Sequence, residues 1–121
     1  MAEKVVILGA SDNPERFAHK AMLMLQQYGH EPILVNPTLN QIAGHTVHAD
    51  LDLVPRPVDT LTVYVNPRIS VNLKEKIISL NPKRVIFNPG TENPAIEFAL
   101  KKTGIDTIHA CTLVMLSTGL Y

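Results

Sequence analysis

The sequence predicts an α/β fold with a doubly wound, mostly parallel sheet of five to six strands, covered by helices on both faces in three layers. Short β-branched apolar runs alternate with segments of helical periodicity along the 121 residues. The apolar runs are unbroken, which is typical of strands buried on both sides of a parallel sheet. No internal repeat, low-complexity tract or linker divides the chain, so we expect a single domain over residues 1–121.

The first third of the chain is predicted to form a strand–helix–strand unit. The apolar run Val5–Leu8 ends at Gly9 and gives the first strand. Apolar residues then recur at helical spacing over residues 15–28, and Gly29 follows where a left-handed C-cap is expected. Residues 32–35 give the second strand. A right-handed parallel crossover is the geometry expected for such a unit.

The rest of the chain continues the alternation. The order predicted is a short edge strand at 45–48, a helical turn at 51–54, a strand at 61–65, a helix through 73–80 with Ser70 as N-cap, a strand at 84–87, a helix from Pro94 to about Lys102, and a strand at 106–109. Asn93 as N-cap with Pro94 at the first helical position marks the start of the last helix.

Ligands of open α/β sheets bind beyond the carboxyl ends of the strands, where the strand order reverses. This rule directs attention to the loops after Leu8, Val35, Val65 and Phe87. Asn-Pro dipeptides occupy or follow several of these strand ends, and proline restricts both its own backbone and that of the preceding residue. We therefore expect a rigid rim around one ligand crevice.

The first of these loops has the features of an anion site. Gly9 allows a close backbone approach to a ligand, Ser11 offers a hydroxyl, and the following helix presents free N–H groups at its positive end. Arg16, His19 and Lys20 fall on one face of that helix. A phosphate group is therefore expected here, with Arg16 as the strongest side-chain contact because a cation in the first turn otherwise opposes the helix dipole.

Two familiar nucleotide motifs do not fit this loop. The dinucleotide pattern G-x-G-x-x-G requires glycine where Ser11 stands and an acidic residue where Asn36 ends the second strand. The triphosphate-binding pattern G-x-x-x-x-G-K-[ST] has no match either. Ordinary NAD binding and nucleoside triphosphate hydrolysis are therefore disfavoured.

Charge and composition narrow the function classes further. Eleven Lys and Arg residues balance eleven Asp and Glu residues, whereas nonspecific binding to nucleic acid or to a membrane surface needs a basic footprint. The apolar run Val5–Leu8 is too short for a signal peptide or a membrane span. We therefore expect a cytoplasmic protein that binds neither nucleic acid nor membranes.

Several segments, in order along the chain, resemble the stand-alone CoA-binding domain proteins. They are residues 7–16, Gly29-His30, the strand end Val35-Asn36-Pro37, Ile42-Ala43-Gly44, Val58-Asp59, Asn88-Pro89-Gly90 and Cys111. Such proteins are similar in turn to the CoA-binding N-terminal domain of the succinyl-CoA synthetase α subunit and of ADP-forming acyl-CoA synthetases. The resemblance spans nearly the whole chain and implies a Rossmann-like fold that binds CoA.

The resemblance also implies where the parts of CoA lie. The implied contacts are Gly9, Ala10, Ser11, Pro14 and Arg16 for the diphosphate, Asn36 and Pro37 for the adenine end, and Tyr64, Asn66, Pro67, Asn88, Pro89 and Gly90 along the pantetheine. Thr38 stands where many relatives carry Lys, which weakens the implied grip on the 3′-phosphate.

No catalytic residue is assigned. The phosphorylated histidine and the ATP-grasp parts of the synthetases lie outside the matched domain, so their activity does not transfer. No nucleophile, general base and orienting group stand at a recognisable spacing. We expect a noncatalytic CoA or acyl-CoA binding protein that acts as a carrier, sensor or partner module. Two alternatives stay open: a subunit of an acyl-CoA synthetase-like enzyme whose partner supplies the nucleotide site, and a nicotinamide-dependent oxidoreductase.

Three further features of the sequence concern metal binding, thiol chemistry and contacts with other chains. His45, His48 and Asp50 match no established metal pattern, so we expect no metal site. Cys111 has no partner for an internal disulfide; it is either a small buried side chain or a thiol that forms a mixed disulfide with CoA. The apolar segment 112–116 either covers the sheet or contacts a second copy or another protein.

Overall fold

Seven strands form one sheet in the computed structural model, which describes residues 2–121. The strands are β1 (Lys4–Leu8), β2 (Glu31–Val35), β3 (Gln41–Ile42), β4 (His45–His48), β5 (Thr60–Val63), β6 (Arg84–Phe87) and β7 (Asp106–His109). Their order is β3-β4-β2-β1-β5-β6-β7, and every neighbouring pair is parallel except β3 with β4. The order reverses between β1 and β5, which confirms the doubly wound, Rossmann-like arrangement.

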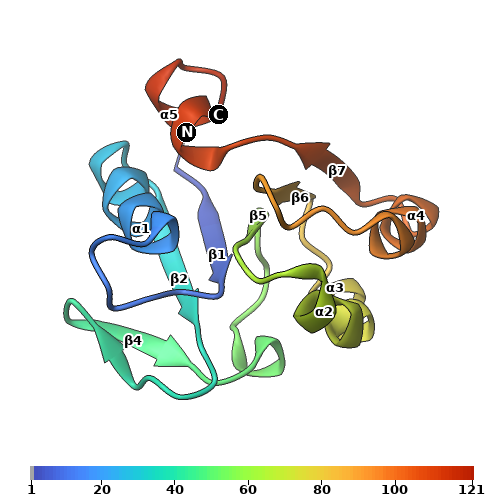
Figure 1. Cartoon of the computed structure of the whole chain (residues 1–121), viewed down its shortest axis with the longest axis horizontal. Coiled ribbons are helices and arrows are strands. Elements are labelled where there is room, and N and C mark those ends of the chain that lie inside the picture. The colour runs from blue at the N-terminus through green and yellow to red at the C-terminus, as the bar shows by residue number, and fades with distance from the viewer. Residues whose placement is uncertain (1) are drawn as a thin grey trace.

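The helices lie on both faces of the sheet (Figure 1). They are α1 (Phe17–Gln27), α2 (Pro67–Ser70), α3 (Lys74–Leu80), α4 (Pro94–Lys102) and α5 (Thr112–Ser117), with short 3-10 turns η1 (Leu51–Leu53) and η2 (Val71–Leu73). One face carries α1 and α5, and the other carries α2, α3 and α4 (Figure 1). The three-layer architecture predicted from the sequence is therefore confirmed.

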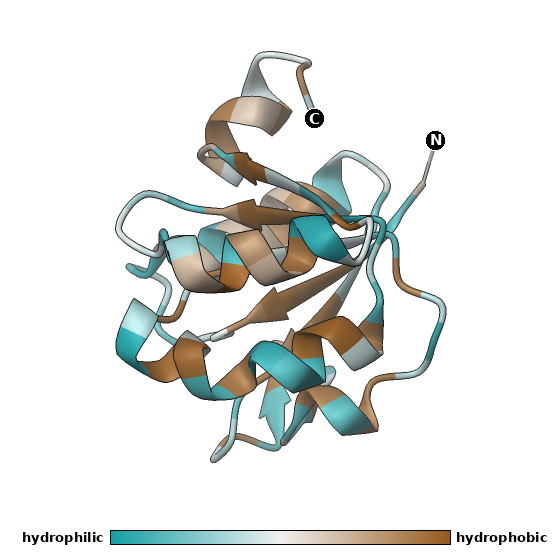
Figure 2. Cartoon of the chain, turned by 90° about the vertical axis from the view of Figure 1, so that its right-hand side faces the viewer, coloured by the Kyte–Doolittle hydropathy of each residue, from teal (hydrophilic) through white to brown (hydrophobic). Residues whose placement is uncertain are grey.

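The central strands supply two hydrophobic cores, one on each face of the sheet. Val5 and Ile7 face the side of α1 and α5, whereas Val6 and Leu8 face the side of α3 and α4. Val5, Val6 and Ile7 have no exposed surface, and burial of each such side chain contributes about 2 kcal/mol. Figure 2 shows largely hydrophobic strands beside helices in which hydrophilic and hydrophobic residues alternate.

Several element boundaries differ from the sequence-based expectation. The sheet has one strand more than the upper estimate, because β3 is a two-residue partner of β4 and too short to leave a periodic signal. Strand β5 spans Thr60–Val63 and therefore ends earlier than residue 65. Helix α1 begins at Phe17 and not at residue 15, because the Arg16 N–H donates to the Asn13 carbonyl in a turn (3.0 Å).

Ser70 is not the N-cap of the helix that follows β5. The chain turns into α2 already at Pro67, where Asn66 Oδ1 accepts the N–H groups of Arg68 (2.9 Å) and Ile69 (3.3 Å). The helical path then continues through η2 into α3. An Asx cap satisfies N–H groups that would otherwise lack an acceptor, so it starts the helix at this earlier point.

The lengths and hydrophobicity of the helices bear on whether any of them could span a membrane. Among residues 2–121, no helix has the length and hydrophobicity that crossing a bilayer requires.

Candidate functional site

A crevice of about 500 Å³ lies at the carboxyl ends of the strands, next to the point where the strand order reverses. It is lined by Gly9, Ala10, Ser11, Asp12, Arg16, Phe17, Ala18, Asn36, Thr38, Leu39, Tyr64, Pro89 and Thr91. These residues come from the loops after β1, β2, β5 and β6, together with the first turn of α1. The rule for open α/β sheets therefore locates the crevice correctly.

Gly9 forms the floor of the crevice, where β1 ends. Its backbone has φ +92°, and a Cβ atom at this position would lie 2.8 Å from Val65 Cγ1 and 3.2 Å from the carbonyl carbon of Tyr64. The Gly9 N–H donates to the Val35 carbonyl (3.1 Å). Only glycine combines this backbone conformation with so close an approach between the ends of β1 and β5.

Unpartnered backbone donors gather at the crevice. Within residues 2–121, the N–H groups of Ser11, Asp12, Phe17 and Ala18 have no acceptor. All belong to residues that line the crevice. The eleven-residue helix α1 adds the partial positive charge of its N-terminus. An anion with several oxygen atoms would satisfy these donors.

The other amides of this loop are already used inside the protein. The Ala10 N–H donates to the Val35 carbonyl (3.0 Å), the Asn13 N–H to Ser11 Oγ (3.1 Å) and the Glu15 N–H to Asn13 Oδ1 (3.0 Å). Pro14 lies in this turn and does not line the crevice. The loop is thus held in one shape without a ligand.

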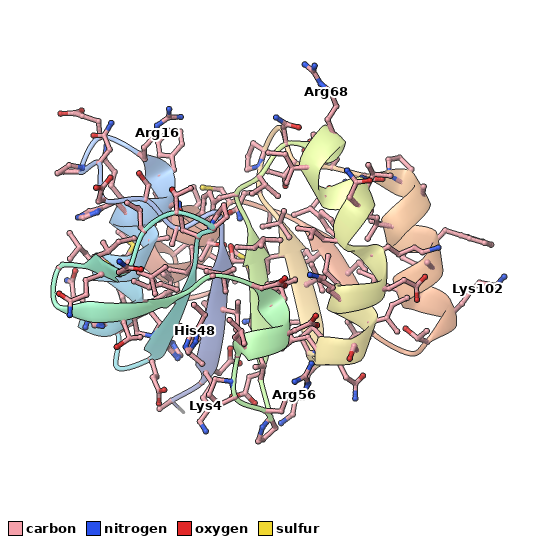
Figure 3. The ribbon with its side chains drawn as sticks, turned by 90° about the horizontal axis from the view of Figure 1, so that it is seen from below. Lys4, Arg16, His48, Arg56, Arg68 and Lys102 are labelled. Atoms are coloured by element: carbon pink, nitrogen blue, oxygen red, sulfur yellow. The ribbon has the colours of Figure 1, made fainter. Side chains whose placement is uncertain are left out.

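Arg16 is the cation among the residues that line the crevice, and Asp12 is the carboxylate. Arg16 occupies the N-cap position of α1 with an extended backbone, and its guanidinium forms no ion pair within residues 2–121. Figure 3 shows Arg16 projecting from the same edge of the molecule as Arg68, whereas Lys4 and Arg56 lie at the opposite edge. Positive charge at the crevice is therefore local, as the neutral composition suggests.

His19 and Lys20 do not line the crevice. The His19 Nδ1 atom is 2.9 Å from the carbonyl oxygen of Ser11, so this half-buried ring holds the loop from behind. Lys20 places its ammonium 5.6 Å from the centre of the Phe17 ring. The helix face that the sequence indicates is real, but only Arg16 of the three side chains lines the cavity.

The asparagines at the strand ends hold loops in place with their side chains. Asn36, which lines the crevice, donates from Nδ2 to the Ala10 carbonyl (2.8 Å) and accepts at Oδ1 from the N–H groups of Thr38 (2.9 Å) and Leu39 (3.1 Å). It therefore ties the loop after β2 to the loop after β1. Asn66 caps α2 and lies outside the crevice lining, as do Pro67 and Gly90.

Asn88 is buried, with 2% of its surface exposed, and is also absent from the crevice lining. Its Nδ2 donates to Thr62 Oγ1 (2.6 Å) and to the Val63 carbonyl (2.9 Å), and its Oδ1 accepts the Thr112 N–H (2.9 Å). These bonds join β6, β5 and the start of α5. The neighbouring Pro89 does line the crevice.

We expect Asn88→Ala to lower the free energy of unfolding by about 3 kcal/mol, because it leaves several buried hydrogen-bonding groups without partners. Urea denaturation measures this change. Asn66→Ala is the matched control: it removes an exposed N-cap and should cost about 1 kcal/mol. Equal losses for the two variants would contradict the role assigned to the buried network.

Tyr64 forms an aromatic wall of the crevice. Its hydroxyl is buried and has no hydrogen-bond partner within residues 2–121. Burial raises the pKa of Tyr64 to about 12. The phenol therefore stays neutral at physiological pH, where it contributes a flat apolar surface and not a proton acceptor.

A smaller apolar pocket of about 230 Å³ adjoins the crevice and shares Gly9 with it. It is lined by Leu8, Gly9, Val35, Pro37, Ala49, Asp50, Leu51, Val65, Ile69 and Leu73. Pro37 belongs to this pocket and not to the crevice. Asp50 is the charged group in its wall, and its hydrogen bond with the Lys76 ammonium holds the pKa of that carboxyl below its usual value.

The model of a known protein family matches residues 3–117, which is nearly the entire chain. That family is described as "CoA binding domain". The chain belongs to this CoA binding domain family. The resemblance noted in the sequence is therefore confirmed.

Curated and solved relatives agree with membership of the CoA binding domain family. The uncharacterized protein YneT of Bacillus subtilis is 30% identical over 103 residues, which cover 85% of this chain and 76% of YneT. A solved but uncharacterized protein is 42% identical with a TM-score of 0.90, and the match covers 100% of this chain and 99% of that one. The cell-free ID.343 protein of Thermus thermophilus is 30% identical, also with a TM-score of 0.90, over 99% of this chain and 91% of that one.

One more distant solved structure shares the fold. It is the dinucleotide forming acetyl-coenzyme A synthetase 1 of Ca. Korarchaeum cryptofilum, in complex with phosphate and ADP. The identity is 17% and the TM-score 0.76, over 89% of this chain and 25% of that one. The CoA binding domain fold of this chain thus also occurs as part of a much longer protein.

The remaining reactive groups of this family member are not among the residues that line the crevice. Cys111 precedes α5, is partly exposed and is not among the lining residues. His45 Nε2 lies 2.9 Å from Gln26 Nε2, and Asp50 bonds to Lys76. Within residues 2–121, no three His, Cys, Asp or Glu residues gather in a metal-binding arrangement.

A second cavity, of about 480 Å³, lies at the amino ends of the strands and includes Glu3, His30, Asp59, Lys83 and Tyr121 in its wall. Its charged groups are already paired. Asp59 accepts the Lys4 N–H (2.8 Å) and lies 3.2 Å from Lys83 Nζ, while Glu3 accepts the Thr60 hydroxyl (2.8 Å). This edge of the sheet therefore differs from the crevice, where the donors are unpaired.

Sequence reasoning missed part of the crevice and most of the apolar pocket. Phe17, Ala18, Leu39 and Thr91 line the crevice, and the pocket wall includes η1 and α2. Asp12 lies in the first loop, which the sequence indicates as an anion site, and Phe17 directly follows this loop. The position of the loop is therefore the signal by which both residues can be predicted. Leu39 and Thr91 follow no motif; only the packing of distant loops brings them to the site.

Proposed function

We propose that this chain binds CoA or acyl-CoA in the crevice, with the diphosphate on the free N–H groups of Ser11, Asp12, Phe17 and Ala18 and beside Arg16. One observation carries the proposal: the backbone donors without an acceptor in the first loop and the first turn of α1 all belong to crevice-lining residues. A diphosphate offers several acceptor oxygens and negative charge, which is the complement of this arrangement.

The adenine and the pantetheine of CoA would extend from this anion site in two different directions. We assign the adenine to the apolar pocket beside Pro37, which opens next to the crevice at Gly9. The pantetheine then runs past Tyr64, Pro89 and Thr91, whose side of the crevice follows β5 and β6. Asn36 contributes by holding the loops after β1 and β2 together.

We propose that the protein is a noncatalytic carrier, sensor or partner module. The residues that line the crevice include no His, Cys or Lys, and the Tyr64 phenol has a pKa of about 12. A pair of nucleophile and base within hydrogen-bond reach is the usual mark of acyl-transfer chemistry. The second candidate is a subunit of a larger acyl-CoA enzyme, which the fold shared with a much longer synthetase favours.

Amide chemical-shift mapping tests the assignment of the anion site. When unlabelled CoA is added to the ¹⁵N-labelled protein, the largest amide shifts are expected for Ser11, Asp12 and Ala18. The amides of Lys4 and Lys83, at the opposite edge of the sheet, should not move. Shifts that cluster at the opposite edge, or no shifts at millimolar CoA, would refute the proposal.

The site is expected to distinguish weakly between CoA and dephospho-CoA. Arg16 is the cation in the walls of the crevice and the pocket, whereas Asp12 and Asp50 are carboxylates. Thr38 donates its hydroxyl to Asn36 Oδ1 (3.1 Å). Without a nearby cation, the additional phosphate gains little, so we expect the two Kd values to agree within about threefold.

Calorimetric titration with both ligands measures this ratio. Thr38→Lys adds a cation at the adenine end and should tighten CoA about fivefold while leaving dephospho-CoA unchanged. If the natural protein bound CoA more than about tenfold tighter than dephospho-CoA, the charge argument would be wrong.

The mixed disulfide between Cys111 and the CoA thiol stays a prediction. Cys111 follows β7 at the carboxyl edge of the sheet and is partly exposed. Its thiolate would attack the disulfide of oxidised CoA, form the protein–CoA disulfide and release one CoA thiolate. Intact mass spectrometry after incubation with oxidised CoA should show one adduct. Absence of the adduct, or its persistence in Cys111→Ser, would end this idea.

A further inference from the structure

The His19 ring contacts the first loop without lining the crevice. It projects from α1, is half-buried, and its Nδ1 atom lies 2.9 Å from the Ser11 carbonyl oxygen. A carbonyl oxygen can only accept a hydrogen bond, so Nδ1 carries the proton and donates it. Apart from this bond, the ring has no hydrogen-bond partner within residues 2–121.

This hydrogen bond determines the direction of a donor that faces the ligand. The Ser11 carbonyl and the Asp12 N–H belong to one planar trans peptide, in which the two groups point in opposite directions. When His19 draws the carbonyl oxygen toward α1, the Asp12 N–H turns away from the His19 ring. Asp12 lines the crevice and its N–H has no protein acceptor.

We propose that His19 is a positioning residue for the anion site: it fixes the Ser11–Asp12 peptide so that the Asp12 N–H is ready to donate to a ligand phosphate. This inference rests on the proposed function of the crevice. It assigns His19 a different role from the one that the sequence indicates, since the ring acts through the backbone and not as a cation on the phosphate.

The neighbouring bonds of the loop show why the peptide needs this support. Ser11 Oγ accepts the Asn13 N–H (3.1 Å) and Asn13 Oδ1 accepts the Glu15 N–H (3.0 Å), so the later part of the loop is fixed by its own side chains. The Ser11–Asp12 peptide takes no part in these bonds. Within residues 2–121, the contact with His19 is the hydrogen bond that the Ser11 carbonyl accepts.

Two substitutions separate positioning from charge. In His19→Asn, the Nδ2 atom is attached to Cγ as the histidine Nδ1 is, so a neutral amide can still donate to the Ser11 carbonyl. In His19→Ala, the donor is lost. Calorimetry with CoA should show about tenfold weaker binding for His19→Ala, which corresponds to partial loss of one hydrogen bond to a charged group. For His19→Asn, we expect a Kd within about threefold of the natural protein.

Amide chemical shifts distinguish loss of the positioning role from a general structural defect, because only the former affects the Asp12 amide selectively. On addition of CoA, the Asp12 amide of His19→Ala should lose most of its shift while the Ala18 amide still moves. Gln27→Ala, at the exposed last position of α1, serves as the control and should bind as the natural protein does.

The binding measurements distinguish an error in the proposed anion site from an error in the role of His19. If CoA does not bind the natural protein, the anion site itself is refuted. If CoA binds the natural protein but His19→Ala binds equally well, or His19→Asn is as weak as His19→Ala, the positioning role is wrong.

Discussion

Replacement of Arg16 by alanine is expected to weaken CoA binding about thirtyfold without loss of stability. A charge-assisted hydrogen bond to a phosphate contributes about 2 kcal/mol, which corresponds to this factor. Arg16 is exposed, forms no ion pair within residues 2–121 and stands at the positive end of α1. Its removal therefore leaves the free energy of unfolding unchanged or slightly higher. Calorimetry and urea denaturation measure the two effects.

Arg68→Ala is the matched control for the Arg16 prediction. Arg68 projects from the same edge of the molecule but does not line the crevice (Figure 3). The variant loses the same charge, so it reports the long-range electrostatic contribution alone, which we expect to change Kd by less than about threefold. Equal weakening by both substitutions would show that Arg16 acts only through its distant field and not by contact.

Replacement of Gly9 by alanine is expected to destabilise the fold by about 3 kcal/mol and to distort the crevice. A φ of +92° is unfavourable for alanine, and the new Cβ would lie 2.8 Å from Val65 Cγ1 and 3.2 Å from the Tyr64 backbone. The two costs add, because the backbone of Tyr64 has to move as well as the Val65 side chain. Urea denaturation gives the loss of stability.

Gly29→Ala separates the two costs at Gly9. Gly29 has φ +86°, similar to that of Gly9, but a Cβ there would meet no atom within 4 Å. This variant should lose only about 1 kcal/mol, the conformational part. If Gly9→Ala costs no more than Gly29→Ala, the close approach between the ends of β1 and β5 is not required for folding.

The sequence predicts most of the fold because the core strands carry a strong local signal. The unbroken apolar run at residues 84–87 coincides with β6, and Asn93 with Pro94 marks the start of α4 correctly. The same Asn-Pro signal at Asn66-Pro67 indicates the end of a strand in the sequence, whereas in the structure Asn66 caps α2. A dipeptide that stops a strand and one that starts a helix look alike, and only the neighbouring hydrogen bonds distinguish them.

The sequence predicts the location of the candidate site better than it predicts which side chains line it. The crevice lies at the first loop and includes Gly9, Ser11 and Arg16, as the glycine and the helix N-terminus indicate. The sequence predicts ligand contacts for His19 and Asn88, and in the structure both side chains form hydrogen bonds with the protein's own backbone. A polar side chain beside a loop can bond to backbone or to ligand, and long-range packing decides between the two.

We expect the crevice to bind CoA through its diphosphate and not to bind a nicotinamide dinucleotide. Asn36 ends β2 with both ends of its side chain bonded to the protein, so the acidic grip on a nicotinamide cofactor's ribose is missing. Calorimetric titration of the natural protein with CoA, acetyl-CoA, NAD and NADP tests this expectation. We expect a Kd for CoA in the micromolar range, on the order of 1–10 μM, and no heat with NAD. Heat with NAD alone, or none with CoA, would contradict it.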